Sequence, residues 1–269
     1  MLLELLKAVI FGLVEGVTEW LPVSSTGHMI LLDKFLKLDV SPEFWAVFLV
    51  VLQLAAALSV AAVYFKRLFP ISHGGIDPKI LSLWGKILLA CLPAAVIGLL
   101  FDEKLNALFY NWQTVSVALI FYGVLFIIVE KTRKSVSKID GMSQLSVKSA
   151  FFIGMFQLLS LIPGTSRSGA TILGAVLLGA SRTVAADFSF FLALPVMLGA
   201  SLLKLTKFGF SFSGAELAIL LTGAASSFLV SLAAIKFLTG YVKKHDFKAF
   251  GVYRAALGLA VMIYFALAA

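Results

Sequence analysis

Long apolar runs constrain this chain more than any other feature of its sequence. Segments of 17 or more residues with almost no charge recur along it, and an α-helix needs about 20 apolar residues to cross a bilayer. Of the 269 residues, 61% are hydrophobic and only 13% are charged, about half the charged fraction of a soluble domain. Because the runs are continuous and do not alternate, they favour helices over the strands of a membrane barrel. We therefore expect an all-α polytopic membrane protein.

Six of the runs are long enough to span a membrane, at 44–65, 84–101, 114–130, 187–203, 215–238 and 251–268. Four others are too short: apolar helices are predicted at 6–21 and 28–38, and again at 148–162 and 169–181. Helices of 11 to 16 residues cover roughly 16–24 Å of a hydrocarbon core of about 30 Å. Since each short pair is joined by a turn rich in Pro, Gly, Ser and Thr, we expect two re-entrant helical hairpins, with turns that are buried in protein or line a cavity.

The two short regions also resemble each other. GLVEGVTEWLPVSSTG at 12–27 follows the plan of GMFQLLSLIPGTSRSG at 154–169, and EFWAVFLVVL at 43–52 echoes DFSFFLALPV at 187–196. This indicates an internal duplication within a single membrane domain, 1–269. Repeat one covers about 1–130, with hairpin 6–38 and three spans, and repeat two covers about 148–269, with hairpin 148–181 and three spans. An odd number of spans per repeat predicts inverted repeats, whose hairpins enter from opposite faces and meet near the midplane.

The basic residues predict the orientation of the chain. The net charge is +8, which in a membrane protein indicates basic cytoplasmic loops and attraction to anionic lipids, not a nucleic-acid partner. Twelve basic residues fall in the segments 66–86, 131–148 and 243–248, and six fall on the other side. The first side is therefore expected to be cytoplasmic, with both termini and the opening of the first hairpin outside.

Two glutamates in the first short helix carry charge in an apolar setting. Glu15 and Glu19 are spaced i, i+4, so their carboxylates share one helix face. A charged residue at bilayer depth costs roughly 2.5–3.5 kcal/mol, so we expect a compensating cation, metal ion, water or shared proton. The alternative is that Glu19 lies near the membrane interface and reaches water.

The turns add hydroxyl groups, backbone N–H groups and one arginine. Ser25 is a candidate nucleophile and His28 a candidate general acid or base, with helix capping and an ordinary polar role as the alternatives. Arg167 carries a planar fork suited to phosphate oxygens, or else pairs with a glutamate. Two helix N-termini and an arginine facing two carboxylates favour a diphosphate, with a divalent metal ion held by Glu15 and Glu19. The turn residues expected to bind the diphosphate are Ser24, Thr26, Gly27, Thr165, Ser166, Arg167, Ser168 and Gly169.

Three stretches carry a resemblance to a known family: EGVTEWLPVSSTGH at 15–28, PGTSRSG at 163–169 and GASRTVAADFSFFLALP at 179–195. Over essentially the whole chain, the sequence resembles the undecaprenyl-diphosphate phosphatases of bacterial inner membranes, also called bacitracin-resistance proteins. The resemblance implies a phosphoric anhydride hydrolase that converts undecaprenyl diphosphate to undecaprenyl phosphate and inorganic phosphate, recycling the lipid carrier for cell-wall synthesis. It also implies dependence on Mg²⁺ or Ca²⁺ and a site that opens to the extracytoplasmic side. The catalytic residues implied are Glu15, Glu19, Ser25, His28 and Arg167.

The competing function is a secondary transporter or flippase of a polyprenyl phosphate lipid, because inverted repeats with interrupted helices are also a transporter plan. A nucleophile beside a base would distinguish the enzyme, although hydrolysis and translocation can coexist in one protein. A purely structural membrane anchor explains neither the glutamates nor the polar turns. The sequence leaves open whether Ser25 or a metal-activated water attacks, and it leaves open the oligomeric state, with a homodimer as one alternative. The expected partners are the polyprenyl diphosphate substrate and membrane lipids.

Overall fold

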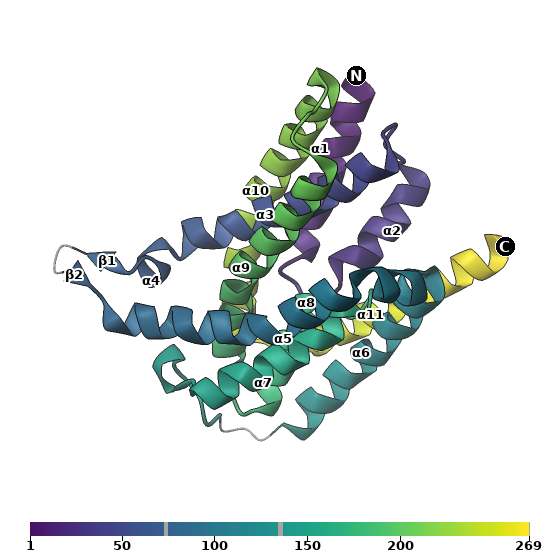
Figure 1. The fold of residues 1–269 in the computed structure, drawn as a ribbon. Coiled ribbons are helices and arrows are strands. Elements are labelled where there is room, and N and C mark those ends of the chain that lie inside the picture. Colours follow the sequence, from purple (N-terminus) through teal and green to yellow (C-terminus); the bar gives the residue numbers. More distant parts are fainter. Residues whose placement is uncertain (73–74, 134–136, 269) are drawn as a thin grey trace.

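The computed structural model describes residues 1–72, 75–133 and 137–268, and the fold is helical throughout most of its length (Figure 1). Lys134, within the basic segment 131–148, lies outside these ranges. Six helices are long and apolar enough to cross a membrane, so the expectation of an all-α polytopic protein with about six spans is confirmed. They are α3 (Pro42–Val63), α5 (Pro78–Phe109), α6 (Trp112–Thr132), α9 (Arg182–Phe208), α10 (Gly214–Val242) and α11 (Lys248–Ala268).

Polar capping residues fix where several of these helices begin. Ser41, Asn111 and Ser213 accept backbone hydrogen bonds from the third residue of α3, α6 and α10, respectively. Such caps satisfy N–H groups that have no partner inside the helix. Five of the six helices are longer than the apolar runs, and α5 extends over Pro78–Phe109, whereas its apolar run covers 84–101. Hydropathy locates the part of a helix that suits lipid, whereas the caps locate its ends.

The four short helices are also present. They are α1 (Leu2–Thr18) and α2 (Ser25–Phe35), then α7 (Val147–Gln157), which continues into the 3₁₀ turn η2 (Leu158–Leu161), and α8 (Arg167–Leu177). The helices after the turns begin earlier than 28 and 169, because Ser24 and Ser166 cap α2 and α8 with their side-chain oxygens. The remaining elements are the short helix α4 (Phe65–Leu68), the antiparallel pair β1 (Ile71–Ser72) and β2 (Gly75–Ile76), and the 3₁₀ turn η1 (Met142–Gln144).

The first helix of each short pair packs backbone to backbone against a long helix. A Cβ atom on Gly12 would lie 2.4 Å from the carbonyl oxygen of Gly223, so α1 contacts α10 closely, as Figure 1 shows. A Cβ atom on Gly154 would lie 2.2 Å from the carbonyl oxygen of Ala90, so α7 contacts α5 in the same way. Any side chain at either glycine would separate the helices. This packing fixes the position of the turn that follows α1 and of the turn that follows α7.

The open ends of the two short pairs lie apart, and their turns meet. Beside the N-terminus, Lys7 Nζ donates to the carbonyl oxygen of Lys37, joining the start of α1 to the chain after α2. The ends of the α7–α8 pair are joined elsewhere, where the N–H of Ile139 donates to the carbonyl oxygen of Gly179. Between them, Ser168 Oγ of the second turn donates to the carbonyl oxygen of Glu19 in the first turn, at 3.0 Å. The polar residues of both turns therefore lie next to one another.

Candidate active site

The carboxylate of Glu19 is the centre of a polar cluster where the two turns meet. Ser25 Oγ donates to Glu19 Oε2 at 2.8 Å, and Arg167 Nη2 donates to Glu19 Oε1 at 3.0 Å. Only 6% of the Glu19 side chain and 10% of the Arg167 side chain are exposed. The predicted ion pair between Arg167 and a glutamate is thus present, and the nucleophile candidate shares the same carboxylate.

An unusual backbone conformation positions both turns. Ser24 and Ser166 have φ angles of 72° and 71°, in the left-handed region that residues with a side chain rarely adopt. The Oγ atom of each serine accepts a hydrogen bond from the backbone N–H of Gly27 or Gly169, at 3.4 and 3.1 Å respectively. Ser25 therefore becomes the first residue of α2, where the helix dipole favours negative charge. Such strained positions cluster at functional sites.

Arg167 occupies the corresponding position in α8 and is held by α9 as well as by Glu19. Its Nη1 donates to the carbonyl oxygen of Ser189 at 2.6 Å, and its guanidinium carbon lies 6.0 Å from the ring centre of Trp20. Thr171 Oγ1 in turn donates to Ser189 Oγ at 2.7 Å. Both ends of the guanidinium fork are thus fixed, one by a carboxylate and the other by a backbone carbonyl. Ser189 was not among the predicted site residues, since its place beside Arg167 depends on how α9 packs.

A second arginine joins the two turns and was also missed. Arg254 of α11 is fully buried; its Nη1 donates to the carbonyl oxygen of Pro22 at 3.2 Å. Its Nη2 donates to the carbonyl oxygens of Gly164 and Thr165 at 2.9 and 2.7 Å. One guanidinium therefore binds backbone from both turns. The sequence did contain a signal for Arg254, which is the one charged residue in the apolar run 251–268. The free-energy cost of a charge at bilayer depth, which drew attention to the glutamates, applies equally to an arginine.

His28 lies beside the cluster and faces α11. Its Nδ1 donates to the carbonyl oxygen of Ser24 at 2.8 Å, and its Nε2 lies 2.7 Å from the hydroxyl of Tyr253. A carbonyl oxygen only accepts, so Nδ1 carries a proton, and Nε2 forms a hydrogen bond with the Tyr253 hydroxyl. The structure therefore brings the Ser25 hydroxyl to Glu19, while both ring nitrogens of His28 are engaged with other groups.

Several buried polar atoms of the short helices and turns have no hydrogen-bond partner within the described part of the chain. They include Glu15 Oε1, both amide atoms of Gln157, Thr165 Oγ1 and Arg167 Nε. Leaving such a group unpaired costs about 1–3 kcal/mol. They are therefore suitable positions for the polar groups of a bound ligand, an ion or water.

The two glutamates are the residues of the cluster that could hold a divalent cation. Glu15 offers a buried carboxylate oxygen without a partner, and Glu19 follows one helical turn later. Among the described residues, no group of three or more His, Cys, Asp or Glu side chains is placed to hold a metal ion. The protein would thus supply two carboxylates, and the remaining ligands would come from water or substrate. Mg²⁺ is commonly bound in this way, by one or two carboxylates together with substrate phosphates.

The described part of the chain has six long apolar helices, which define a multi-pass membrane protein. Its buried cluster of a serine, a carboxylate and an arginine is a polar site suited to an anionic ligand. The chain belongs to the family described as Bacitracin resistance protein BacA, which matches residues 8–260. The resemblance seen in the sequence is confirmed.

Three similar proteins each carry the name undecaprenyl-diphosphatase. The protein of Acetivibrio thermocellus is 57% identical over 268 residues, covering 98% of both chains. That of Desulfitobacterium hafniense is 55% identical over 269 residues, covering 98% of this chain and 97% of its own. That of Enterococcus faecalis is 54% identical over 268 residues, covering 97% of both. The similarity extends over nearly the full length of each chain.

Proposed function

We propose that the protein is an undecaprenyl-diphosphate phosphatase, which hydrolyses undecaprenyl diphosphate to undecaprenyl phosphate and inorganic phosphate. The observation that carries the proposal is the shared carboxylate of Glu19, which accepts from Ser25 and pairs with Arg167. A nucleophile, a base and a phosphate-binding fork thus lie together at a helix N-terminus. Full-length identity above 50% to proteins named for this activity supports the substrate. The product is the lipid carrier used in cell-wall synthesis.

In the proposed reaction, Ser25 attacks the terminal phosphorus of the diphosphate. Glu19 takes the hydroxyl proton, which its 2.8 Å hydrogen bond to Ser25 favours. The bond from phosphorus to the bridging oxygen breaks, and undecaprenyl phosphate leaves with the electron pair. Water then attacks phosphoserine, which restores Ser25 and releases inorganic phosphate. The rival route is direct attack by water, with Ser25 donating a hydrogen bond to a phosphate oxygen.

Arg167 and the two turns bind the diphosphate in this proposal. As the substrate enters, its oxygens compete with Glu19 for the guanidinium, and the unpaired Arg167 Nε provides a further donor. Glu19 then keeps its hydrogen bond to Ser25 while Arg167 binds the phosphate oxygens. The backbone N–H groups at the starts of α2 and α8 contribute to the same anion site. The remaining diphosphate-binding residues are proposed to be Ser24, Thr26, Gly27, Thr165, Ser166, Ser168 and Gly169.

Glu15 and Glu19 are proposed to hold a divalent cation, Mg²⁺ or Ca²⁺. When bound, the cation would neutralise charge on the diphosphate and on the two carboxylates. The unpaired Glu15 Oε1 supports this assignment. His28 is proposed to assist proton transfer, since it is partly exposed and is bonded to Ser24, the residue preceding the nucleophile.

We also propose that the two short pairs are re-entrant hairpins of an inverted repeat, spanning about 1–130 and 148–269. One offset of 142 residues relates Ser24 to Ser166 and Gly27 to Gly169, and α2 and α8 both have 11 residues. It also relates Ser25 to Arg167, so the nucleophile and the arginine hold equivalent positions. The charge of the loops favours a site that opens to the extracytoplasmic side, and membership of the family supports a bacterial inner membrane as its location. A homodimer is the oligomeric alternative, which light scattering of the purified protein would test.

The decisive experiment is phosphate release from undecaprenyl diphosphate by the purified protein, with and without a chelator. We expect release in the presence of Mg²⁺ or Ca²⁺, loss of activity on chelation, and recovery when the cation is restored. A folded protein that releases no phosphate with either cation would exclude the enzyme. Movement of a polyprenyl phosphate across liposome membranes by that inactive protein would favour the flippase instead.

A further inference from the structure

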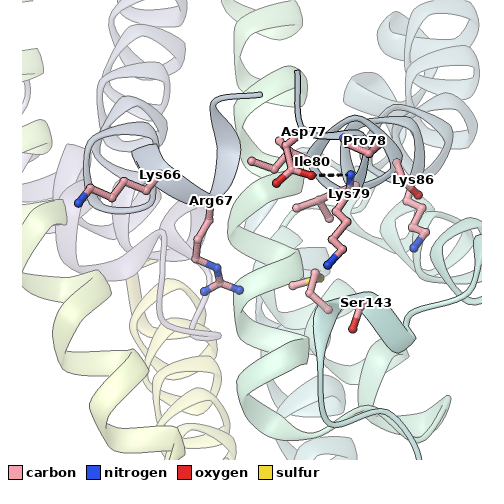
Figure 2. A pocket seen from close by; sticks show the side chains of 11 residues that line it. Lys66, Arg67, Asp77, Pro78, Lys79, Ile80, Lys86 and Ser143 are labelled. Carbon is pink, nitrogen blue, oxygen red and sulfur yellow. Dashed lines mark hydrogen bonds between the residues drawn. The ribbon is translucent and has the colours of Figure 1, made fainter. Parts of the chain in front are cut away.

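A charged cavity lies away from the turns, at the end of the molecule that carries the β1–β2 pair. Its volume is about 510 Å³, and Figure 2 shows the side chains that line it. Three segments build it: α4, the first turns of α5, and η1. Among the polar residues at its wall are Lys66, Arg67, Asp77, Lys79, Lys86 and Ser143. Neither the proposed reaction nor the residues of the two turns involve this cavity.

The wall of the cavity has an excess of positive charge. Among the described residues at the wall, the one carboxylate is Asp77, which accepts a hydrogen bond from the backbone N–H of Lys79 and so caps α5. Arg67 Nη1 pairs with Asp187 Oδ2 of α9 at 2.7 Å, which keeps the guanidinium at the wall. Lys66, Lys79 and Lys86 form no ion pair within the described ranges. Four cations therefore face two carboxylates, and three of the cations are available to a ligand.

The donors come from opposite sides of the cavity. In Figure 2, Lys79 extends from α5 toward Ser143 of η1, with Lys86 beside it, and Arg67 projects from the side of α4, while Lys66 points away from the other three. The cavity also includes Pro78, the first residue of α5, where the helix dipole adds positive potential. Phosphate oxygens accept hydrogen bonds from ammonium, guanidinium and hydroxyl groups, and all three kinds of donor line this cavity.

The surface that leads away from the cavity is apolar. Leu81 and Leu88 are exposed on α5, and Phe65, Ile71 and Ile76 are exposed on the adjacent α4 and β1–β2 pair. Only 17% of the apolar window of α5 is buried inside the protein, against 28–44% for the other five spans. A ligand with its head in the cavity could therefore place a hydrocarbon chain along α5. The combination of a basic cavity and an exposed apolar helix is typical of sites for anionic lipids.

We propose that this cavity binds the phosphate head group of a membrane lipid, with the lipid chain lying along α5. The site is separate from the Glu19 cluster and does not depend on the function proposed for that cluster. The ligand chemistry is a phosphate ester on a long hydrocarbon chain. An anionic phospholipid and a polyprenyl monophosphate both contain such a phosphate ester, and the two tests below compare these lipids directly.

The first test is lipid binding by the full-length protein in detergent, measured by native mass spectrometry. The probes are phosphatidylglycerol, undecaprenyl phosphate and, as the zwitterionic control, phosphatidylcholine. We expect Lys79→Gln combined with Lys86→Gln to weaken binding of the anionic lipids by roughly 25-fold, since each lysine near a lipid head group contributes about fivefold. The matched control is Lys243→Gln combined with Lys244→Gln, two exposed lysines outside the cavity, for which we expect less than about a threefold loss.

The second test locates the ligand. Cys91 is the only cysteine, so Ser143→Cys in a Cys91→Ala background places one reactive thiol at the cavity wall. We expect phosphatidylglycerol or undecaprenyl phosphate to slow maleimide labelling of this thiol, and phosphatidylcholine to have no effect. The lipid that protects at the lower concentration is the better ligand, and protection by inorganic phosphate alone would show recognition of the head group without the chain.

Three outcomes would overturn the proposal. Equal losses of binding in the two double variants would mean that the lysines act only through general surface charge. Phosphatidylcholine binding as tightly as the anionic lipids would exclude phosphate recognition by the basic wall. Labelling of Ser143→Cys that no phosphate-bearing lipid slows would place the bound lipid elsewhere.

Discussion

Ser25 and Arg167 begin α2 and α8, and each binds one oxygen of the Glu19 carboxylate. The hydroxyl and the guanidinium thus compete for the same negative charge. In the proposed reaction, a diphosphate that draws Arg167 away releases Glu19 Oε1 and leaves Oε2 bonded to Ser25, which would link substrate binding to activation of the serine. This coupling follows from the geometry of one carboxylate, and the predictions below test its parts.

Ser25→Ala should lower kcat/KM by several orders of magnitude. Loss of one ordinary hydrogen bond removes roughly 0.5–1.5 kcal/mol, or about tenfold in rate, whereas loss of the attacking group removes the covalent route. Ser25→Cys should retain some turnover. Ser59→Ala is the matched control, because Ser59 is buried and donates only to its own helix at Ala56. A tenfold loss in Ser25→Ala, or quenched-flow trapping without phosphoserine, would favour direct attack by water.

Arg167→Lys should reduce kcat/KM by at least about 100-fold, although it keeps the charge. One ammonium group cannot reproduce the fork that reaches both Glu19 and Ser189, and hydrogen bonds to charged groups contribute about 1.5–3 kcal/mol each. The control is Arg182→Lys, at an ion pair with Glu130 outside the cluster. It should lower thermal stability and leave kcat/KM of the folded protein nearly unchanged. Near-normal kcat/KM in Arg167→Lys would make Arg167 a structural partner of Glu19.

Mg²⁺ or Ca²⁺ should raise the thermal midpoint Tm of the substrate-free protein. A ligand at 100 times its Kd stabilises the folded state by about 2.7 kcal/mol, which corresponds to roughly 5–10 °C for a chain of this size. Glu15→Gln and Glu19→Gln should each abolish this shift and the activity. Scanning fluorimetry measures the shift independently of turnover. If the wild-type enzyme stays active after exhaustive chelation, the cation has no place in the reaction.

Arg254→Met should destabilise the protein and inactivate it, because the carbonyl groups of Pro22, Gly164 and Thr165 would lose a shared charged donor. Gly169→Ala should act in the same direction, since its Cβ atom would lie 2.7 Å from Arg254 Nη1. Tyr264→Phe, also on α11, serves as a control with little expected change. The measurements are Tm and kcat/KM. Wild-type values of both in Arg254→Met would show that the two turns hold together without it.

The orientation can be tested with single cysteines in a Cys91→Ala background. Lys37→Cys should react with a membrane-impermeant maleimide in intact cells, whereas Lys79→Cys and Lys244→Cys should react only after permeabilisation. All three native lysines are exposed in the structure, so accessibility depends on the membrane and not on burial. Labelling of Lys79→Cys from outside would reverse the orientation that the loop charges predict.

Much of the fold could be predicted because lipid restricts what a long apolar run can do. The six spans and the four short helices were located from hydropathy and length, while their ends depended on caps such as Ser24 and Ser166. The contacts of the cluster were harder to predict. Glu19, Ser25 and Arg167 were expected to meet, and they do.

The partners that α9 and α11 supply were not predicted. Ser189 and Arg254 reach the turns only through tertiary packing, which a single sequence does not specify. His28 lies three residues after Ser25, but its hydrogen bond to the carbonyl oxygen of Ser24 directs the ring toward Tyr253. Closeness in sequence therefore did not determine which base adjoins the serine.

The left-handed serines at the two turns have a consequence for the energetics of catalysis. A left-handed residue with a side chain costs roughly 1–2 kcal/mol, and glycine would adopt the same φ freely. Serine nevertheless caps the helix at both positions, so the helix starts that carry Ser25 and Arg167 are oriented before any anion arrives. Electrostatic preorganisation of this kind requires no rearrangement of dipoles as charge develops on the reacting group. The free-energy cost of the two strained φ angles arises once, during folding, and the site is already aligned when each catalytic cycle begins.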